Sequence, residues 1–180
     1  MRRPRRLPDY LRPGLKVVFV GINPGLMSAM AGHYYANPRN PFWRFLHEAG
    51  LMPFRLAPTE DSRLLDLGYG LTDIVKRPSR GVGELAPREF RQGRKILEEK
   101  LLKAEALIVC FNSKSAFVGF FGRETFRAFG RQRVRIGRSR VYVLPSTSPA
   151  NAGVPLSVKR RYFRGLKKWL DALEKSSESG

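Results

Sequence analysis

Residues 15–43 read LKVVFVGINPGLMSAMAGHYYANPRNPFW, and this stretch organises the rest of the chain. Its apolar, β-branched start predicts a buried strand over residues 16–20. The strand ends at residues 21–25, Gly-Ile-Asn-Pro-Gly, where two glycines and a proline break regular structure. Open α/β sheets bind ligands at the carboxyl ends of their strands, so this turn is a candidate site with Asn23 as its one polar side chain. By itself the pentapeptide is equally consistent with a tight turn.

Strands and helices alternate along the remaining sequence. Strands are predicted at residues 16–20, within 68–75, and at 106–111 and 141–144, and helices near residues 41–49, 59–67, 87–104, 114–121 and 156–175. The predicted fold class is α/β, a three-layer α/β/α sandwich around a short, mainly parallel sheet. We expect residues 1–13 to form a basic flexible tail, residues 14–175 a single domain, and residues 176–180 a disordered end.

The composition indicates a polyanionic partner. The chain has 34 lysines and arginines against 15 acidic residues, a net charge of +19. A single cysteine, Cys110, excludes an internal disulfide and favours a reducing compartment. With two histidines and no clustered ligand spacing, we expect no metal and no cofactor. No apolar run has the length of a signal peptide or a membrane span, so we expect a cytoplasmic protein with no membrane partner.

The residues after the pentapeptide make the pattern more specific, because Ser28, His33-Tyr34-Tyr35 and Asn37-Pro-Arg-Asn-Pro lead into Phe42-Trp43. Over residues 15–173, the chain resembles the mismatch-specific uracil/thymine DNA glycosylases of the uracil-DNA glycosylase superfamily. The resemblance implies a base-excision repair enzyme that extrudes uracil, or also mismatched thymine or damaged pyrimidines, from DNA. It would hydrolyse the N-glycosidic bond with a positioned water and leave an abasic site. The implied partner is double-stranded DNA with uracil or a mismatch, bound by a nucleoid-associated monomer.

The resemblance also assigns roles in the base pocket. It implies that Tyr35 stacks on the extruded base, that Ile22 and Ser28 bind the base, and that Asn23 positions the water. Residues 70–75 match the family form G-x-T-x-x-V, whose variable position, here Asp73, faces the base. Because an amide is not a general base near neutral pH, Asp73 is the candidate for stabilising the cationic sugar or accepting the proton of the water. The alternative is that Asp73 pairs with a surface arginine.

Further residues are expected to contact the DNA backbone. Ser113 and Lys114 follow a predicted strand at a helix start, where they suit a phosphate, although plain helix capping is the alternative. The second family motif is a loop that enters the DNA where the base has left. It corresponds to Ser146, Thr147, Ser148, Pro149, Ala150 and Asn151. The family usually has a larger side chain than Ala150 at the tip. Seven arginines between residues 123 and 140 predict a basic hairpin or loop that either contacts phosphate or is simply solvated.

Two other classes of function remain open from the sequence. A non-catalytic nucleic-acid-binding domain would need the charge and the aromatic residues but not the turn at Asn23. A nucleotide-binding α/β enzyme could use residues 21–25 as a phosphate cradle. Against the second, the chain has neither G-x-G-x-x-G nor a P-loop lysine, and Pro24 lacks the amide hydrogen that a cradle needs.

Overall fold

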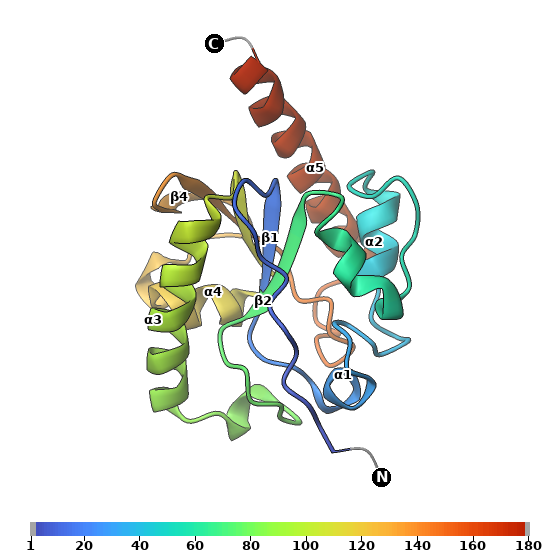
Figure 1. Ribbon diagram of the computed structural model, residues 1–180, viewed down its shortest axis with the longest axis vertical. Coiled ribbons are helices and arrows are strands. Elements are labelled where there is room, and N and C mark those ends of the chain that lie inside the picture. The colour runs from blue at the N-terminus through green and yellow to red at the C-terminus, as the bar shows by residue number, and fades with distance from the viewer. Residues whose placement is uncertain (1–2, 179–180) are drawn as a thin grey trace.

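Five strands form one central sheet in the computed structural model, which describes residues 3–178 (Figure 1). The strands are β1 (Val17–Gly21), β2 (Tyr69–Asp73), β3 (Ile108–Phe111), β4 (Gly130–Ile136) and β5 (Ser139–Val143), and their order in the sheet is β2-β1-β3-β5-β4. The strands β1, β2, β3 and β5 are parallel, and β4 pairs antiparallel with β5 at one edge. Every residue of β1, β2 and β3 is buried, which is expected for a parallel sheet covered on both faces.

Helices cover both faces of this sheet. On one face, α2 (Phe42–Glu48), the 3₁₀ helix η1 (Pro58–Leu64) and α5 (Leu156–Glu178) pack in one core with Val17 and Phe19. On the other face, α3 (Pro87–Ala104) and α4 (Lys114–Phe121) pack in a second core with Val18 and Val20. Alternate residues of β1 therefore serve opposite layers, as the period of a strand requires. The predicted three-layer α/β/α sandwich is confirmed.

Several elements differ from the prediction in detail, and for the basic segment, predicted as a hairpin or a loop, one of the two forms is observed. The loop between β1 and α2, residues 22–41, is here called the motif loop. It contains a short helix, α1 (Leu26–Ala31), built mainly from leucine, methionine and alanine, which are good helix formers. The segment expected as a helix at residues 59–67 is the 3₁₀ helix η1, and two further short 3₁₀ helices are η2 (Val82–Glu84) and η3 (Arg123–Thr125). The basic segment is a true hairpin formed by β4 and β5. Within residues 3–178, no helix is both long enough and apolar enough to cross a membrane.

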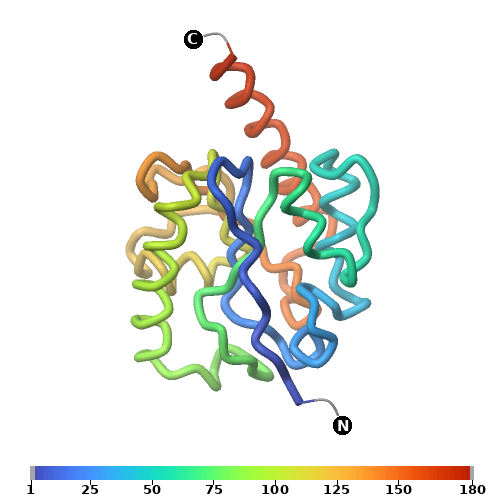
Figure 2. Tube along the Cα trace, in the orientation of Figure 1, coloured from blue at the N-terminus to red at the C-terminus, as the bar shows by residue number. Residues whose placement is uncertain are grey.

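The expectation of a flexible tail at residues 1–13 is wrong for residues 3–13, and residues 1–2 lie outside the described part of the chain. Leu7 is 2% exposed and belongs to the core beneath α2 and α5. Tyr10 forms an antiparallel bridge to Leu71 of β2, with N–O distances of 2.9 and 3.1 Å. Residues 3–13, here called the N-terminal strap, run alongside β2, the edge strand (Figure 2). The strap pairs with backbone groups of the edge strand that would otherwise lack a partner. Leu7 and Tyr10 supply its apolar contacts, which the arginine- and proline-rich composition of the segment does not indicate.

Asp9 fastens the strap to three other elements. Its carboxylate accepts hydrogen bonds from Thr72 Oγ1 at 2.7 Å, Lys76 Nζ at 2.7 Å and Lys100 Nζ at 2.6 Å. Burial acts to raise the pKa of Asp9, but the two lysines and Thr72 together hold it below its ordinary value. The strap is therefore joined to β2, to the segment after it and to α3.

The prediction for the other end of the chain is also corrected in part. Residues 176–178, expected to be disordered, continue α5 as helix to Glu178. Residues 179–180 lie outside the described part.

Candidate active site

The carboxyl ends of the parallel strands meet at the end of the sheet where α1 lies in Figure 1. Gly21, the last residue of β1, pairs with Asp73, the last residue of β2. Phe111, the last residue of β3, pairs with Val20 on one side and with Val143 on the other. The segments that start at residues 22, 112 and 144 therefore leave the sheet together, and they carry most of the predicted site.

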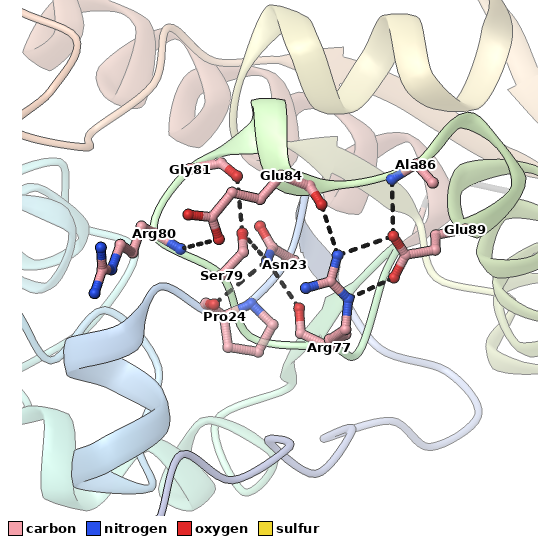
Figure 3. Close-up of polar contacts among 9 residues, drawn as sticks. All are labelled: Asn23, Pro24, Arg77, Ser79, Arg80, Gly81, Glu84, Ala86 and Glu89. Atoms are coloured by element: carbon pink, nitrogen blue, oxygen red, sulfur yellow. Dashed lines mark hydrogen bonds and ion pairs between the residues drawn. The ribbon is translucent and has the colours of Figure 1, made fainter.

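Asn23 is held by its amide nitrogen. Its Nδ2 donates to the backbone oxygen of Arg77 at 2.9 Å and to Ser79 Oγ at 2.8 Å (Figure 3). A carbonyl oxygen can only accept, so these contacts determine which side of the amide carries the nitrogen. No hydrogen bond among the described residues uses Asn23 Oδ1. The free polar atom of Asn23 is therefore the acceptor Oδ1. The hydrogen bonds of Nδ2 keep the side chain from rotating.

The segment that holds Asn23 is itself anchored to α3. The Arg77 guanidinium pairs with the Glu89 carboxylate at 2.7 and 3.0 Å and donates to the Glu84 backbone oxygen at 2.7 Å (Figure 3). The Ser79 hydroxyl donates to Gly81 O at 2.9 Å, so it is free to accept from Asn23. We call residues 76–84 the support loop. The support loop holds the side-chain amide of Asn23 in one orientation.

Asp73 is a buried carboxylate with an unused oxygen. It is 5% exposed, and its Oδ2 has no hydrogen-bond partner. Burial raises the pKa of Asp73 to about 7, with the charge of Lys76 acting to lower it and that of Asp9 to raise it. Asp73 does not form a surface ion pair with an arginine, which was the alternative interpretation. A buried acceptor without a partner costs free energy, so the position is suited to a ligand that supplies a donor.

Tyr35 lies against Asp73 across Gly21. A Cβ atom at Gly21 would lie 2.5 Å from Asp73 Oδ1 and 3.6 Å from the Tyr35 hydroxyl, so only glycine allows these groups to come together. The Tyr35 ring is stacked on Phe42, with centroids 3.8 Å apart and planes inclined by 24°. Its backbone is left-handed, with φ at 51°. Packing against Phe42 and the strained backbone fix the Tyr35 ring beside the carboxyl ends of β1 and β2.

Asn112 is a site residue that the sequence interpretation missed. It follows β3 directly, is 6% exposed, and donates through Nδ2 to Thr147 Oγ1 at 3.3 Å, while its Oδ1 has no partner. The pKa of Tyr35 is raised by burial and by the charge of Asp73, and a hydrogen bond with Asn112 opposes this. Polar side chains thus stand at or just beyond the ends of three strands: Asp73 is the last residue of β2, Asn112 directly follows β3, and Asn23 lies two residues after β1. A polar residue at the end of a buried strand is the signal that could have found Asn112.

Comparison with known proteins identifies the family of this chain. Residues 8–170 match the family model described as the uracil DNA glycosylase superfamily. The chain belongs to the uracil DNA glycosylase superfamily. Its fold also matches the solution NMR structure of a protein from Methanosarcina acetivorans, named provisionally as a uracil DNA glycosylase. That match has a TM-score of 0.59 at 23% sequence identity, and it covers 91% of this chain and 98% of the other.

Two residues that the superfamily resemblance assigned to base binding are already engaged with backbone. The carbonyl oxygen of Ile22 accepts from Val75 N at 2.8 Å. The Ser28 hydroxyl accepts from Ala36 N at 3.1 Å and so joins α1 to the segment that follows it. Base contact by Ile22 or Ser28 stays a prediction.

The loop at residues 146–151 is ordered by its own hydroxyls. Ser146 Oγ accepts from Ser148 N at 3.2 Å, and Ser148 Oγ accepts from Ala150 N at 3.3 Å, which leaves Pro149 and Ala150 exposed at the tip. The expected phosphate contact by Thr147 needs correction, since this residue is 1% exposed and its hydroxyl bonds inward to Asn112. Thr147 is small and lies just after a buried strand, so its hydroxyl can face the interior and accept the hydrogen bond from Asn112.

A cation supports this loop from beneath. Lys159, in the first turn of α5, is 3% exposed and donates to Asn151 O at 2.7 Å. Burial lowers the pKa of Lys159. Together with Arg39 it lines a cavity of about 270 Å³ beside residues 147–149. Neither Arg39 nor Lys159 was predicted as a site residue. By sequence, Lys159 resembles a solvent-facing lysine of an amphipathic helix, and Arg39 is one of many arginines in a basic chain.

Ser113 and Lys114 occupy the start of α4 in this glycosylase fold. Ser113 is the N-cap, and its Oγ accepts from Ala116 N at 2.9 Å, which is the plain capping role that the sequence left as the alternative. Lys114 is exposed, and its ammonium lies 4.9 Å from the centroid of the Phe126 ring. A phosphate contact by Ser113 or Lys114 stays a prediction.

Proposed function

We propose that this chain excises uracil from DNA by hydrolysing the N-glycosidic bond, as a monofunctional mismatch-type glycosylase that leaves an abasic site. The observation that carries the proposal is the fixed amide of Asn23, whose two donor hydrogens are consumed and whose Oδ1 is free. An acceptor held in this way can orient a water by binding one of its hydrogens. The superfamily membership of residues 8–170 supports the reaction class.

The reaction needs a nucleophile, a proton acceptor and a place for the leaving base. The water oxygen bonds to C1′ while the C1′–N1 bond breaks, and the electron pair of that bond leaves with the base. Asn23 orients the water, and ionised Asp73 stabilises the positive charge on the sugar or takes the proton of the water. With its pKa at about 7, Asp73 is ionised in part of the population at neutral pH.

The unused acceptors suggest how the base is recognised. Asp73 Oδ2 and Asn112 Oδ1 are both buried acceptors without partners, and the uracil N3–H is a donor on the edge of the base. Tyr35 has Phe42 stacked on one face of its ring, and we propose that its other face receives the extruded base. Thymine and damaged pyrimidines are further proposed substrates.

The substrate form is part of the same proposal. We propose double-stranded DNA with uracil in a mismatch, because the exposed tip at Pro149 and Ala150 lies on an ordered loop that can enter the space left by the base. The small tip predicts weak discrimination of the opposite base. The enzyme would act as a monomer at the nucleoid, and gel filtration with and without DNA checks the monomer.

Gel electrophoresis of labelled duplexes after alkaline cleavage of abasic sites tests the function. The substrates carry uracil opposite guanine, uracil opposite adenine, thymine opposite guanine, or uracil in a single strand. Cleavage at uracil by the parent protein, and much slower cleavage by Asn23→Ala, is expected. Binding to every duplex without cleavage would instead indicate a non-catalytic nucleic-acid-binding domain, and neither binding nor cleavage would favour a nucleotide-binding enzyme.

A further inference from the structure

A strongly basic edge of the sheet lies apart from the candidate active site. From Thr125 to Leu170 the sequence contains twelve lysines and arginines and no acidic residue. Three of these arginines, Arg131, Arg133 and Arg135, alternate along β4, the edge strand, and all three are exposed. We call these three residues the β4 strip.

The residues of the β4 strip are exposed and alternate with less exposed residues, and the register of β4 against β5 is irregular between Arg131 and Arg135. Arg131 lies over the Trp169 ring of α5, with its guanidinium carbon 5.1 Å from the ring centroid. Val134 and Ile136, which point the opposite way, pack in the core with α3 and α4. Within residues 3–178, no arginine of the strip forms an ion pair with a carboxylate, so all three charges are available to a partner.

The neighbouring helix adds positive charge to the same region. Tyr162 of α5 lies 3.7 Å from the Cβ position of Gly130, and Trp169 lies under Arg131. The residue before each of these rings is exposed and basic, namely Arg161 and Lys168. Helix α5 and strand β4 therefore both present exposed basic side chains in this region.

The strip runs away from the loops that form the candidate active site. Gly130 pairs with Val143 at the carboxyl end of β5, whereas Ile136 pairs with Ser139 at its beginning. The register is irregular between Arg131 and Arg135, so the seven residues of β4 lie opposite the five residues Ser139–Val143 and span about 14 Å. In Figure 1, the label of β4 and that of α1 stand at opposite ends of the sheet. A duplex lying across the loops at residues 22–40 and 146–151 would therefore not follow this edge.

We propose that the β4 strip binds the phosphate backbone of a second stretch of double-stranded DNA, separate from the stretch that the active-site loops engage. The strand is irregular between Arg131 and Arg135, but the long arginine side chains can still spread to reach separate phosphates. At about 3.4 Å rise per base pair, β4 faces about four base pairs. This inference rests on the proposed function only in taking DNA as the partner, since it does not require base excision.

The chemistry of the strip favours a duplex over other partners. Single strands are held by aromatic platforms on which bases stack, whereas the Trp169 ring is 8% exposed beneath Arg131 and the neighbouring Tyr162 is half-buried. Charges on an edge strand also hinder edge-to-edge pairing of sheets, but a charge of either sign, from lysine or from glutamate, would do that equally well. Three arginines without a carboxylate select for a polyanion.

The salt dependence of binding to an unmodified duplex tests the phosphate contacts. The test variant is Arg133→Gln with Arg135→Gln, which leaves the packed Arg131 in place so that folding is preserved. Each lost phosphate contact lowers the slope of log K against log salt by about 0.9, so the double variant should lose about 1.8. The matched control is Lys95→Gln with Lys103→Gln, two exposed positions on α3 among glutamates, which should keep the parent slope. Equal slopes in the test variant and the parent would overturn the proposal.

Counting duplexes per protein tests whether the strip is a separate site. Two unmodified duplexes of about 12 base pairs, longer than the stretch that β4 faces, carry different fluorophores, and energy transfer reports their presence on one protein. The parent and the control should bind two duplexes and the test variant one. If the active-site loops do not bind DNA, the parent binds one duplex and the test variant none, which upholds the strip and contradicts the proposed function. One duplex on both parent and test variant, or two on both, would reject the strip. Preference for duplex RNA in the same assay would reject DNA as its partner.

Discussion

Asn23 and Asp73 illustrate opposite ways in which a residue is prepared for chemistry. The donors of Asn23 are saturated by the support loop, so its one free atom has a defined direction. Asp73 instead keeps an unsatisfied oxygen in a buried place, where the energetic cost is recovered only when a ligand supplies a donor or a positive charge. The first arrangement orients a water, and the second favours the transition state.

The clearest prediction at this scale concerns Asn23. Asn23→Ala should lower the single-turnover rate of uracil excision by about 10²–10⁴-fold, because the water loses its acceptor. Affinity for the DNA should change little, since Asn23 carries no charge. Ser79→Ala serves as the matched variant that keeps the amide but removes one of the groups orienting it, and it should show a smaller loss. A parent-like rate in Asn23→Ala would remove the central claim of the proposed function.

Asp73 gives a prediction for the pH dependence of activity. If its ionised form assists the reaction, the excision rate should rise as pH increases through about 7, where Asp73 loses its proton. Asp73→Asn should lower the plateau and remove the inflection, because the amide cannot ionise. Single-turnover rates across the pH range check this. An unchanged profile in the variant would assign Asp73 to base recognition or to structure.

The same carboxyl predicts how stability changes with pH. The pKa of Asp73 is about 7 in the folded chain against a model value of 3.8, so the folded state holds a proton that the unfolded state has released between these two values. The free energy of unfolding should therefore fall as pH rises across that window, by at most about 1.4 kcal/mol per pH unit. Urea titrations of the parent and Asp73→Asn should differ most above pH 7. Parallel curves would mean that Asp73 titrates normally.

At the scale of elements, the N-terminal strap is the unexpected component. It covers the free edge of β2, places Leu7 in a core and holds Lys76 through Asp9. Lys76 begins the support loop and lowers the pKa of Asp73, so the strap reaches the site through one ion pair. A segment that resembles a solvated tail by composition therefore shapes the electrostatics of the pocket.

The strap should contribute measurably to stability. Leu7→Ala should lower the free energy of unfolding by about 2–5 kcal/mol, the range for deleting a buried leucine side chain. The control is Leu102→Ala on α3, where the leucine is 47% exposed, and it should cost far less. Equilibrium urea unfolding measures both. Equal effects of the two substitutions would show that the strap is as loosely held as the composition indicates.

At the scale of the whole molecule, the net charge of +19 dominates the first encounter with DNA. Affinity of the parent for a duplex without uracil should fall by about 10³–10⁵-fold between 50 and 200 mM salt if six to ten phosphates are contacted. Fluorescence anisotropy measures this, and the excision rate at saturating protein should stay nearly constant over the same range. A flat salt response would mean that most of the positive charge faces solvent only.

Much of the fold could be predicted because local patterns report burial directly. The β-branched runs at residues 16–20 and 106–111 and the apolar face of α3 needed no knowledge of their partners. Gly93 of α3 has a reason that only the tertiary structure shows, since a Cβ there would lie 2.1 Å from Ile74 O. The edge pairing of the strap was missed because Arg and Pro mask two apolar anchors.

By itself, the sequence determined the order of strands and helices, the excess of positive charge and the turn at Asn23, since each depends on neighbours along the chain. The tertiary structure decided which atoms of those residues remain free. Asn112 joined the site and Thr147 turned inward because contact between β3 and the segment after β5 makes them partners. Asp73 acquired a pKa of about 7 because packing excludes water from it, and no sequence pattern encodes the solvent around a single carboxylate.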